Sequence, residues 1–289
     1  MAGRFRILVI GRANAGKTTI LKRICDTTDE PEIYNINGKK IDKLTVEPTN
    51  KRGFHDINNE MVFRSNPDFI FHDSRGFEAG GTDELQQVKD FVSRCSKEKG
   101  LANQLHVIWY CIPMDSSRPI THAEVQFFSK LGTGKVPVVV IFTKSEALEL
   151  NAVNILQEQK GLDFKGAVKE AADYAKEYLQ MTHLILEKYK YPPKGHVYLQ
   201  GMEKSNTDCR DLVECTANVL DSVTLQAIFV SMQQVNIEIS IKFSIIYILD
   251  HFWKKGKTEE ISGLILITYM RSFPYWVSGY LTHETAQSR

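Results

Sequence analysis

One stretch near the amino end carries residues whose types and spacing suit phosphate binding. Residues 11–18 read Gly-Arg-Ala-Asn-Ala-Gly-Lys-Thr and fit G-x-x-x-x-G-K-[ST] in full. The two glycines allow a tight turn whose successive N–H groups point at phosphate oxygens. The lysine would reach the outer phosphates, and the threonine hydroxyl would bind Mg²⁺. We expect a nucleoside triphosphate to contact Gly11, Arg12, Ala13, Asn14, Ala15, Gly16, Lys17, Thr18 and Thr19.

A second stretch, residues 72–76, reads His-Asp-Ser-Arg-Gly. Asp73 follows an expected strand over residues 69–72, and a carboxylate at that point can hold Mg²⁺ through its water shell. Gly76 can bring its N–H to a terminal phosphate with no side chain in the way. A strand-end Asp that caps a turn would give the same letters.

A third stretch reads Thr143-Lys144-Ser145-Glu146 and follows the apolar run 136–142. A lysine and a carboxylate thus follow an expected strand, at the edge of a parallel sheet where ligands bind. The alternative interpretation is an ordinary helix start in a surface loop.

The elements that position these motifs alternate between strand and helix, which predicts a three-layer α/β domain with a mostly parallel sheet. Continuous apolar runs indicate strands that are buried on both faces. Residues 26–53 are polar and read as a long loop, and residues 151–166 read as irregular. A hairpin is expected from residues 55–63 and 68–72. The other strands are expected at 4–10, 105–112, 136–142 and 196–199, and the helices at 16–25, 83–95, 121–131, 167–189 and 208–220.

The three motifs, in this order, resemble those of P-loop GTPases of the translation-factor-related class, over about residues 4–220. The resemblance implies a three-layer G domain with a mostly parallel six-stranded sheet, one strand of it antiparallel. It implies that Lys144 lies over guanine and that the acid at position 146 accepts hydrogen bonds from guanine N–H groups. Glu146 is one methylene longer than the aspartate of that family, so its reach to guanine differs.

The phosphate loop itself is similar to the Era and TrmE branch, on Arg12 and Asn14. In some relatives the matching asparagine helps to coordinate K⁺, which implies potassium-stimulated hydrolysis with Asn14, Lys17 and Gly76 as the catalytic residues. Asn14 as a plain turn residue is the alternative.

Three further positions follow from the resemblance. Thr49, with Thr45 as second choice, is expected to bind Mg²⁺ together with Thr18 and Asp73. Gly201, after the last strand, is expected under the guanine, although Cys215-Thr216-Ala217 imitates that motif by its letters. Phe77 replaces the water-orienting glutamine of the signalling GTPases and cannot hydrogen-bond a water molecule.

The composition restricts the partners and the cellular location that we expect for the protein. Lysine and arginine number 36 against 35 acidic residues, a balance that argues against broad nucleic-acid binding. Five cysteines, an odd number in apolar segments, indicate reduced core residues of a cytoplasmic protein. The first strand begins close to Met1, so we expect no signal peptide.

Residues 222–289 are predicted to form a helical extension beyond a G domain over residues 1–221. Residues 222–253 lack Gly and Pro and show helical spacing, although strict alternation over residues 235–243 favours a strand. A second helix is expected over 258–270. The apolar stretch 261–281 is too short before Arg271 to span a bilayer, so packing on the G domain or a partner is favoured over contact with a membrane surface.

Three functions fit these observations. The first is a switch that binds GTP with Mg²⁺, hydrolyses it to GDP and passes the change to a protein effector through its mobile loops or its carboxyl-terminal helices. The second is a nucleotide-sensing scaffold that hydrolyses little. The third is an ATP-specific enzyme on the same fold, which leaves residues 143–146 unexplained.

Overall fold

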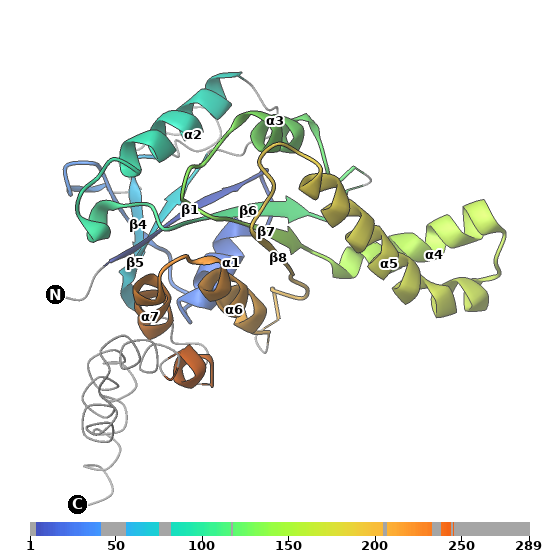
Figure 1. The fold of residues 1–289 in the computed structure, drawn as a ribbon. Helices are drawn as coiled ribbons and strands as arrows, with labels where there is room; N and C mark the ends of the chain where they lie inside the picture. The colour runs from blue at the N-terminus through green and yellow to red at the C-terminus, as the bar shows by residue number, and fades with distance from the viewer. Residues whose placement is uncertain are drawn as a thin grey trace, which may run out of the picture.

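The computed structural model describes residues 4–41, 56–74, 82–116, 118–204, 207–232, 238–243 and 245. Its centre is an eight-stranded sheet with the order β3-β2-β4-β5-β1-β6-β7-β8 (Figure 1). The parallel part contains β1 (Phe5–Gly11), β5 (Asn66–Asp73), β6 (Val107–Pro113), β7 (Val138–Thr143) and β8 (Gly195–Tyr198). The remaining strands are β2 (Glu32–Tyr34), β3 (Lys40–Ile41) and β4 (Glu60–Phe63).

Helices cover both faces of the sheet and give three layers (Figure 1). On one face, the sheet forms a hydrophobic core with α1 (Lys17–Ile24), α6 (Arg210–Val219) and α7 (Val223–Met232). On the other face, it forms a second hydrophobic core with α2 (Thr82–Cys95) and α3 (His122–Lys130). Every residue of β6 and β7 is buried, as a strand covered on both faces requires. The predicted α/β class and its layers are confirmed.

The sheet is larger than the predicted six strands, and it contains three antiparallel pairings instead of one antiparallel strand. The additional strands β2 and β3 lie in the polar segment that was expected to be a loop. Asn35 Oδ1 accepts from the N–H groups of Asn37 and Lys39 at 3.0 and 2.9 Å, and Gly38 has φ 72°, so a tight turn joins the two strands. Glu32 then binds Lys40 and Arg64 across neighbouring strands at 2.7 and 2.6 Å. Charged partners therefore stabilise strands that an apolar pattern could not reveal.

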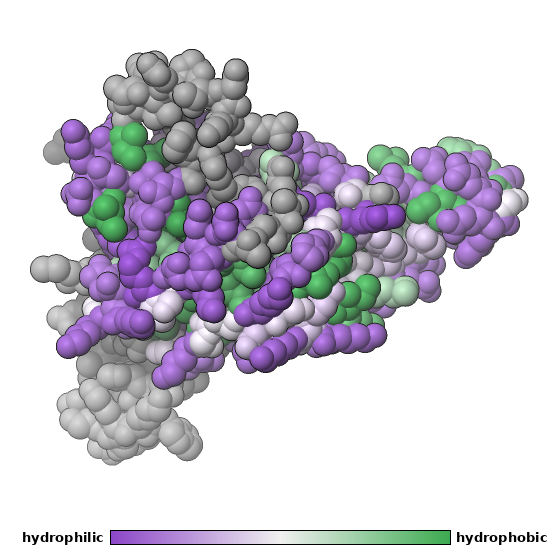
Figure 2. All heavy atoms as spheres, turned by 90° about the horizontal axis from the view of Figure 1, so that it is seen from above, coloured by the Kyte–Doolittle hydropathy of each residue, from purple (hydrophilic) through white to green (hydrophobic). Residues whose placement is uncertain are grey.

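The prediction of irregular structure over residues 151–166 is wrong for most of that segment. Helix α4 (Glu146–Lys160) and helix α5 (Phe164–Glu187) form a hairpin that projects from the domain (Figure 1). In the buried contact between the two helices, Ala152 and Leu156 pack on Ala167 and Ala171. So few apolar residues make a narrow stripe on the helix, and the helix was therefore missed. Apolar side chains also lie on the outer surface of this hairpin (Figure 2). The exposed large apolar residues of the two helices are Leu150, Phe164, Val168, Met181, Leu184 and Ile185.

The carboxyl-terminal segment is helical wherever it is described, at residues 223–232 and 238–243. The helical interpretation of residues 222–253 is therefore confirmed over these parts, and the alternating pattern at 238–243 does not form a strand. Phe229 of α7 contacts Phe5 and Phe69 with ring centroids 4.9 and 5.7 Å apart. The expected helix at 258–270 and the apolar stretch 261–281 lie outside the described residues. No helix in the described part of the chain is long and apolar enough to cross a membrane.

Candidate functional site: a phosphate loop and a base-binding edge

The loop between β1 and α1 has the geometry of a phosphate cradle. Gly11 has φ 152°, and a Cβ atom at this position would lie 2.5 Å from the Cys111 carbonyl oxygen, so no other residue fits. Asn14 and Gly16 have φ 61° and 76°, and Gly16 is the N-cap residue of α1. The backbone N–H groups of the loop and of the first helical turn are thereby available to an anion at the helix N-terminus.

Lys17 and Asp73 face each other across this loop, because β5 is the direct parallel neighbour of β1. Lys17 Nζ donates to Gly11 O at 2.9 Å and to Arg12 O at 3.1 Å, and it lies 3.9 Å from Asp73 Oδ1. Both side chains are largely covered, with exposed fractions of 12% and 13%. An ammonium group and a carboxylate so close to the cradle are the charges that a phosphate and a divalent cation require.

The donors expected for Mg²⁺ are hard oxygens, as that ion prefers. Thr18 is exposed at the second position of α1, the helix that follows β1, and Asp73 ends β5, the parallel neighbour of β1. Thr19 is partly buried one residue further along. Thr49, Thr45, Gly76 and Phe77 lie outside the described residues. The described donors fit a magnesium ion beside the phosphate cradle.

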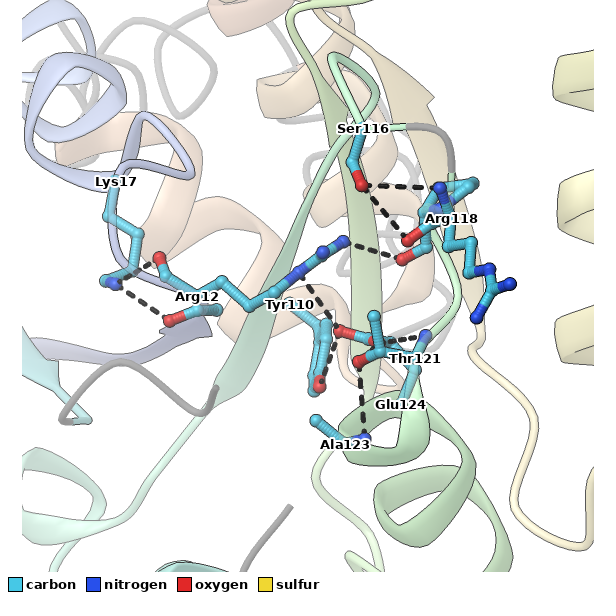
Figure 3. Close-up of polar contacts among 10 residues, drawn as sticks. Arg12, Lys17, Tyr110, Ser116, Arg118, Thr121, Ala123 and Glu124 are labelled. Carbon is cyan, nitrogen blue, oxygen red and sulfur yellow. Dashed lines mark hydrogen bonds and ion pairs between the residues drawn. The ribbon is translucent and has the colours of Figure 1, made fainter. Parts of the chain in front are cut away.

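The side chain of Arg12 points away from the cradle (Figure 3). Arg12 Nη2 donates to Pro119 O at 2.7 Å, and Arg12 Nε lies 3.9 Å from Glu124 Oε1. The neighbouring Ala13 and Asn14 are exposed, whereas Ala15 is buried. The guanidinium group of Arg12 therefore contacts the segment around α3, while Arg12 O accepts from Ala15 N at 3.2 Å within the loop.

The third motif stands at the carboxyl end of β7, on the same edge of the sheet as the phosphate loop. Thr143 is buried, and its Cβ lies 3.9 Å from where a Cβ would stand on Gly16. Lys144 has φ 56°, and Lys144 Nζ binds Asp115 Oδ2 at 2.6 Å. Only Asn14, Asp26 and Lys144 combine a side chain with positive φ among the described residues. Two of these three strained positions therefore lie in predicted motifs, as is common at functional sites.

Glu146 reaches the turn after β8. Gly201 donates its N–H to Glu146 Oε2 at 3.1 Å, and Gly201 has φ 59°. Arg23 of α1 donates to the carbonyl oxygens of Met202 and Lys204 at 3.1 and 2.7 Å, which ties the same turn to the phosphate side. The competing placement at Cys215-Thr216-Ala217 lies inside α6, where Thr216 is buried and accepts a hydrogen bond from Trp109 Nε1. The structure thus brings Glu146 and Gly201 together and leaves residues 215–217 in the core.

Three residues near the site were not predicted: Asp115, Glu124 and Arg23. Asp115 follows β6, and a carboxylate after a buried parallel strand was a usable signal. Glu124 lies at the start of the helix expected over residues 121–131, where Thr121 and Glu124 form a full capping box. No sequence signal pointed to Arg23, since its contacts span 179 residues or more.

Residues 6–144 match the family model described as "50S ribosome-binding GTPase". This part of the chain is a P-loop GTPase domain. The match contains the phosphate loop, Asp73 and the beginning of the third motif, Thr143 and Lys144. It supports binding of GTP by this domain. A search of curated protein sequences gave no match.

Solved structures with a similar arrangement include G domains of iron transporters. An NFeoB mutant from S. thermophilus, bound to GDP, has a TM-score of 0.38 and 14% identity and covers 91% of this chain and 88% of that chain. The G domain of the T. maritima FeoB iron transporter has a TM-score of 0.36 and 14% identity, with coverages of 75% and 98%. The FeoB G-domain from Methanococcus jannaschii has a TM-score of 0.38 and 12% identity, and the match covers 76% of this chain and 99% of that chain. TM-scores this low support no further statement about the function of this domain.

Proposed function

We propose that this chain is a molecular switch that binds GTP with Mg²⁺ and hydrolyses it to GDP. The observation that carries the proposal is the meeting of two sets of residues at one sheet edge. Lys17 and Asp73 provide the charges for phosphates and metal, and Glu146 with Gly201 forms the opposite, base-binding side. Ligands of parallel α/β sheets bind outside the carboxyl ends of the strands, where both sets lie.

In this proposal Lys17 exchanges its contacts with Gly11 O and Arg12 O for phosphate oxygens. Bound Mg²⁺ would neutralise charge on the phosphates, with Thr18 and Asp73 as its described ligands and Thr49 as a further one. Gly76 would donate its N–H to the terminal phosphate. Lys144 would lie over guanine, and Glu146 would accept from the base with the oxygen that Gly201 leaves available.

The finer placement near the Era and TrmE branch rests on Arg12 and Asn14 in the phosphate loop. Asn14 is exposed, so its side chain is accessible to a cation beside the phosphates. We include K⁺ as a second cation, whose positive charge would stabilise charge that develops between the phosphates. A cytoplasmic location is part of the proposal, since Cys25, Cys95, Cys111, Cys209 and Cys215 are all free thiols.

A second candidate, a scaffold that senses nucleotide and hydrolyses little, is favoured by the packing of α7. This helix lies in the same core as the strand that leads into the phosphate loop, so a protein effector on the carboxyl-terminal helices would contact elements connected to the site. Both candidates require guanine nucleotide binding and differ in turnover.

One experiment separates the candidates. GTP, GDP and ATP are titrated into the full chain by calorimetry with Mg²⁺ present, and phosphate release from GTP is then followed in potassium and in sodium buffer. The switch predicts binding of GTP and GDP, weak binding of ATP, and measurable release of phosphate. Tight binding without release supports the scaffold. Preference for ATP would overturn both and favour an ATP-specific enzyme.

A further inference from the structure

Glu124 is a carboxylate in the interior of the domain, at an exposed fraction of 0%. Its Oε2 accepts from Thr121 N at 2.6 Å and from Thr121 Oγ1 at 2.5 Å, and Tyr110 OH lies 3.4 Å from Oε1. Oε2 thus closes the cap of α3, whereas Oε1 faces the phosphate loop (Figure 3). A helix cap alone does not need a buried charge, because capping boxes work at the surface.

The cation beside this carboxylate is Arg12, the second residue of the phosphate loop. Burying a carboxylate is costly unless a positive group lies close to it. Arg12 Nε is buried, lies 3.9 Å from Glu124 Oε1 and makes no hydrogen bond within the described residues. The other end of the guanidinium group is anchored on Pro119 O. Arg12 is therefore held at two points of one structure, the start of α3 and the segment before it.

The backbone of Arg12 belongs to the phosphate cradle. Arg12 O accepts from Lys17 Nζ at 3.1 Å and from Ala15 N at 3.2 Å, so the position of this peptide sets both the lysine and the turn. A shift of Arg12 would move the N–H groups and the ammonium group together. Pre-organised donors bind an anion well only when their positions are fixed.

We propose that Glu124 is a positioning residue for the phosphate loop, which acts through Arg12 to fix the cradle against α3. The inference rests on the proposed nucleotide-binding function and deepens it. It assigns to the arginine of the loop a role that is independent of direct contact with phosphate. Glu124 itself touches neither nucleotide nor metal in this role.

The same segment is tied to the base side of the site. Asp115, four residues before Pro119, binds Lys144 Nζ. Asp115 is thus held by the base-binding motif, and Pro119 by the phosphate loop. Weakening the Arg12–Glu124 contact should affect phosphate groups first, because Asp115 and Lys144 keep the base side in place.

The test compares Glu124→Gln, Arg12→Met and the double variant in the full chain. We expect each single variant to bind GDP about tenfold more weakly, while affinity for guanosine, measured by ligand-observed NMR, changes by less than about twofold. The double variant should bind GDP no more weakly than the weaker single variant, because both changes break one contact. Hydrogen exchange of the amides of residues 13–17 should be faster in all three without nucleotide.

Thr121→Ala is the matched control. It removes the capping hydroxyl and one of the two hydrogen bonds to Glu124 Oε2, which lowers stability, but it keeps the bond from Thr121 N and the contact of Arg12 with Glu124 Oε1. Its affinity for GDP and its amide exchange at residues 13–17 should equal those of the wild type. If Glu124→Gln does not fold, Glu124→Asp can be used for the same test. It keeps the negative charge but moves the carboxylate one methylene further from Arg12.

Two results would overturn the inference: wild-type affinity for GDP in folded Glu124→Gln, or losses that add in the double variant. Equal losses for GDP and guanosine would also overturn it, since they indicate general damage. Failure of the wild type to bind GDP would instead contradict the proposed function.

Discussion

Lys17 Nζ lies 3.9 Å from Asp73 Oδ1 while it donates hydrogen bonds to two carbonyl oxygens of its own loop. The ammonium group is thus held at the cradle by backbone carbonyls and a carboxylate, and phosphate oxygens would take over the carbonyl contacts. This arrangement explains how a charged lysine can be largely covered before a ligand arrives, since three oxygen atoms surround it.

Lys17→Ala removes the charge that faces the phosphates. We expect the affinity for GTP and GDP to fall by about hundredfold or more, since the loss of a charge-assisted contact to phosphate exceeds that of a neutral one. Calorimetry measures the effect. The control is Lys22→Ala on the same helix, where Lys22 binds Glu30 and the Thr28 carbonyl, and it should bind as the wild type does. Unchanged binding by Lys17→Ala would contradict the central assignment.

Asn14 combines an exposed side chain with φ 61°, so the backbone and the amide can be tested separately. Asn14→Gly keeps the left-handed backbone and removes the amide group. We expect it to retain affinity for GTP within about threefold and to lose any stimulation of phosphate release by K⁺ over Na⁺. Asn14→Ala should also weaken binding, because Ala is strained at this φ. Equal turnover of the wild type in both salts would refute the role of potassium.

Glu146 links the third motif to the turn at Gly201. Glu146→Ala leaves the Gly201 N–H without its carboxylate and removes the acceptor expected for guanine. We expect the preference for GTP over ATP to fall about tenfold or more, as judged by competition against a fluorescent nucleotide. Glu149→Ala, an exposed acid one turn along α4, serves as control and should keep the preference. A Glu146→Ala protein that still discriminates fully would place base recognition elsewhere.

Two buried histidines give the fold a pH dependence. Burial, with the charge of Arg6 adding to it, lowers the pKa of His72 to about 4, and burial lowers the pKa of His106 to about 4. The neutral rings contribute stability that is fully present above the unfolded pKa near 6.5 and is lost as the pH falls toward 4. Each histidine should reduce the free energy of unfolding by about 1.4 kcal/mol per pH unit in this window.

Urea unfolding at several pH values between 7.5 and 5 measures this slope. His72→Gln should reduce the dependence of the free energy of unfolding on pH by the contribution of one histidine. His122→Gln, at an exposed position of α3, should leave this dependence unchanged. A slope that His72→Gln leaves intact would show that other groups cause the acid sensitivity.

Phe229 anchors α7 on the sheet, at an exposed fraction of 0%. Phe229→Ala should lower the free energy of unfolding by about 3–5 kcal/mol, because it leaves a cavity between Phe5 and Phe69. Phe164→Ala on the α4–α5 hairpin removes the same ring from a site that is 66% exposed, so it should cost less than about 0.5 kcal/mol. Equal effects of the two variants would mean that α7 is not part of the folded core.

The sequence predicted the parts of this fold that depend on local chemistry and long apolar runs. The turn at Gly11 and Gly16, the buried strands and the helix that begins near Thr121 all follow from residues close together in the chain. Helix α4 was missed because only Leu148, Ala152 and Leu156 of this helix are fully buried, an apolar stripe too narrow to recognise without its partner helix. Strands β2 and β3 were missed because they are short and mostly polar: Ile33 packs on the core, and ion pairs of Glu32 add to their pairing.

The predicted site residues came together only in part within the described chain. Lys17 meets Asp73, and Glu146 meets Gly201, as expected from motifs at the ends of neighbouring strands. The side chain of Arg12 could not be placed from its motif, because its partners Pro119 and Glu124 lie more than 100 residues away. Thr49 and Gly76 remain predictions, since they lie outside the described residues. Contacts over such separations depend on the assembled sheet, which no local pattern encodes.

The close approach of Gly11 to the carbonyl oxygen of Cys111 has a genetic consequence. Every single-base change in a glycine codon that alters the amino acid introduces a side chain or a stop, and any side chain here would collide with the neighbouring strand. This codon therefore has no conservative missense allele. Even a substitution by alanine should therefore distort the phosphate loop or lower the stability of the domain.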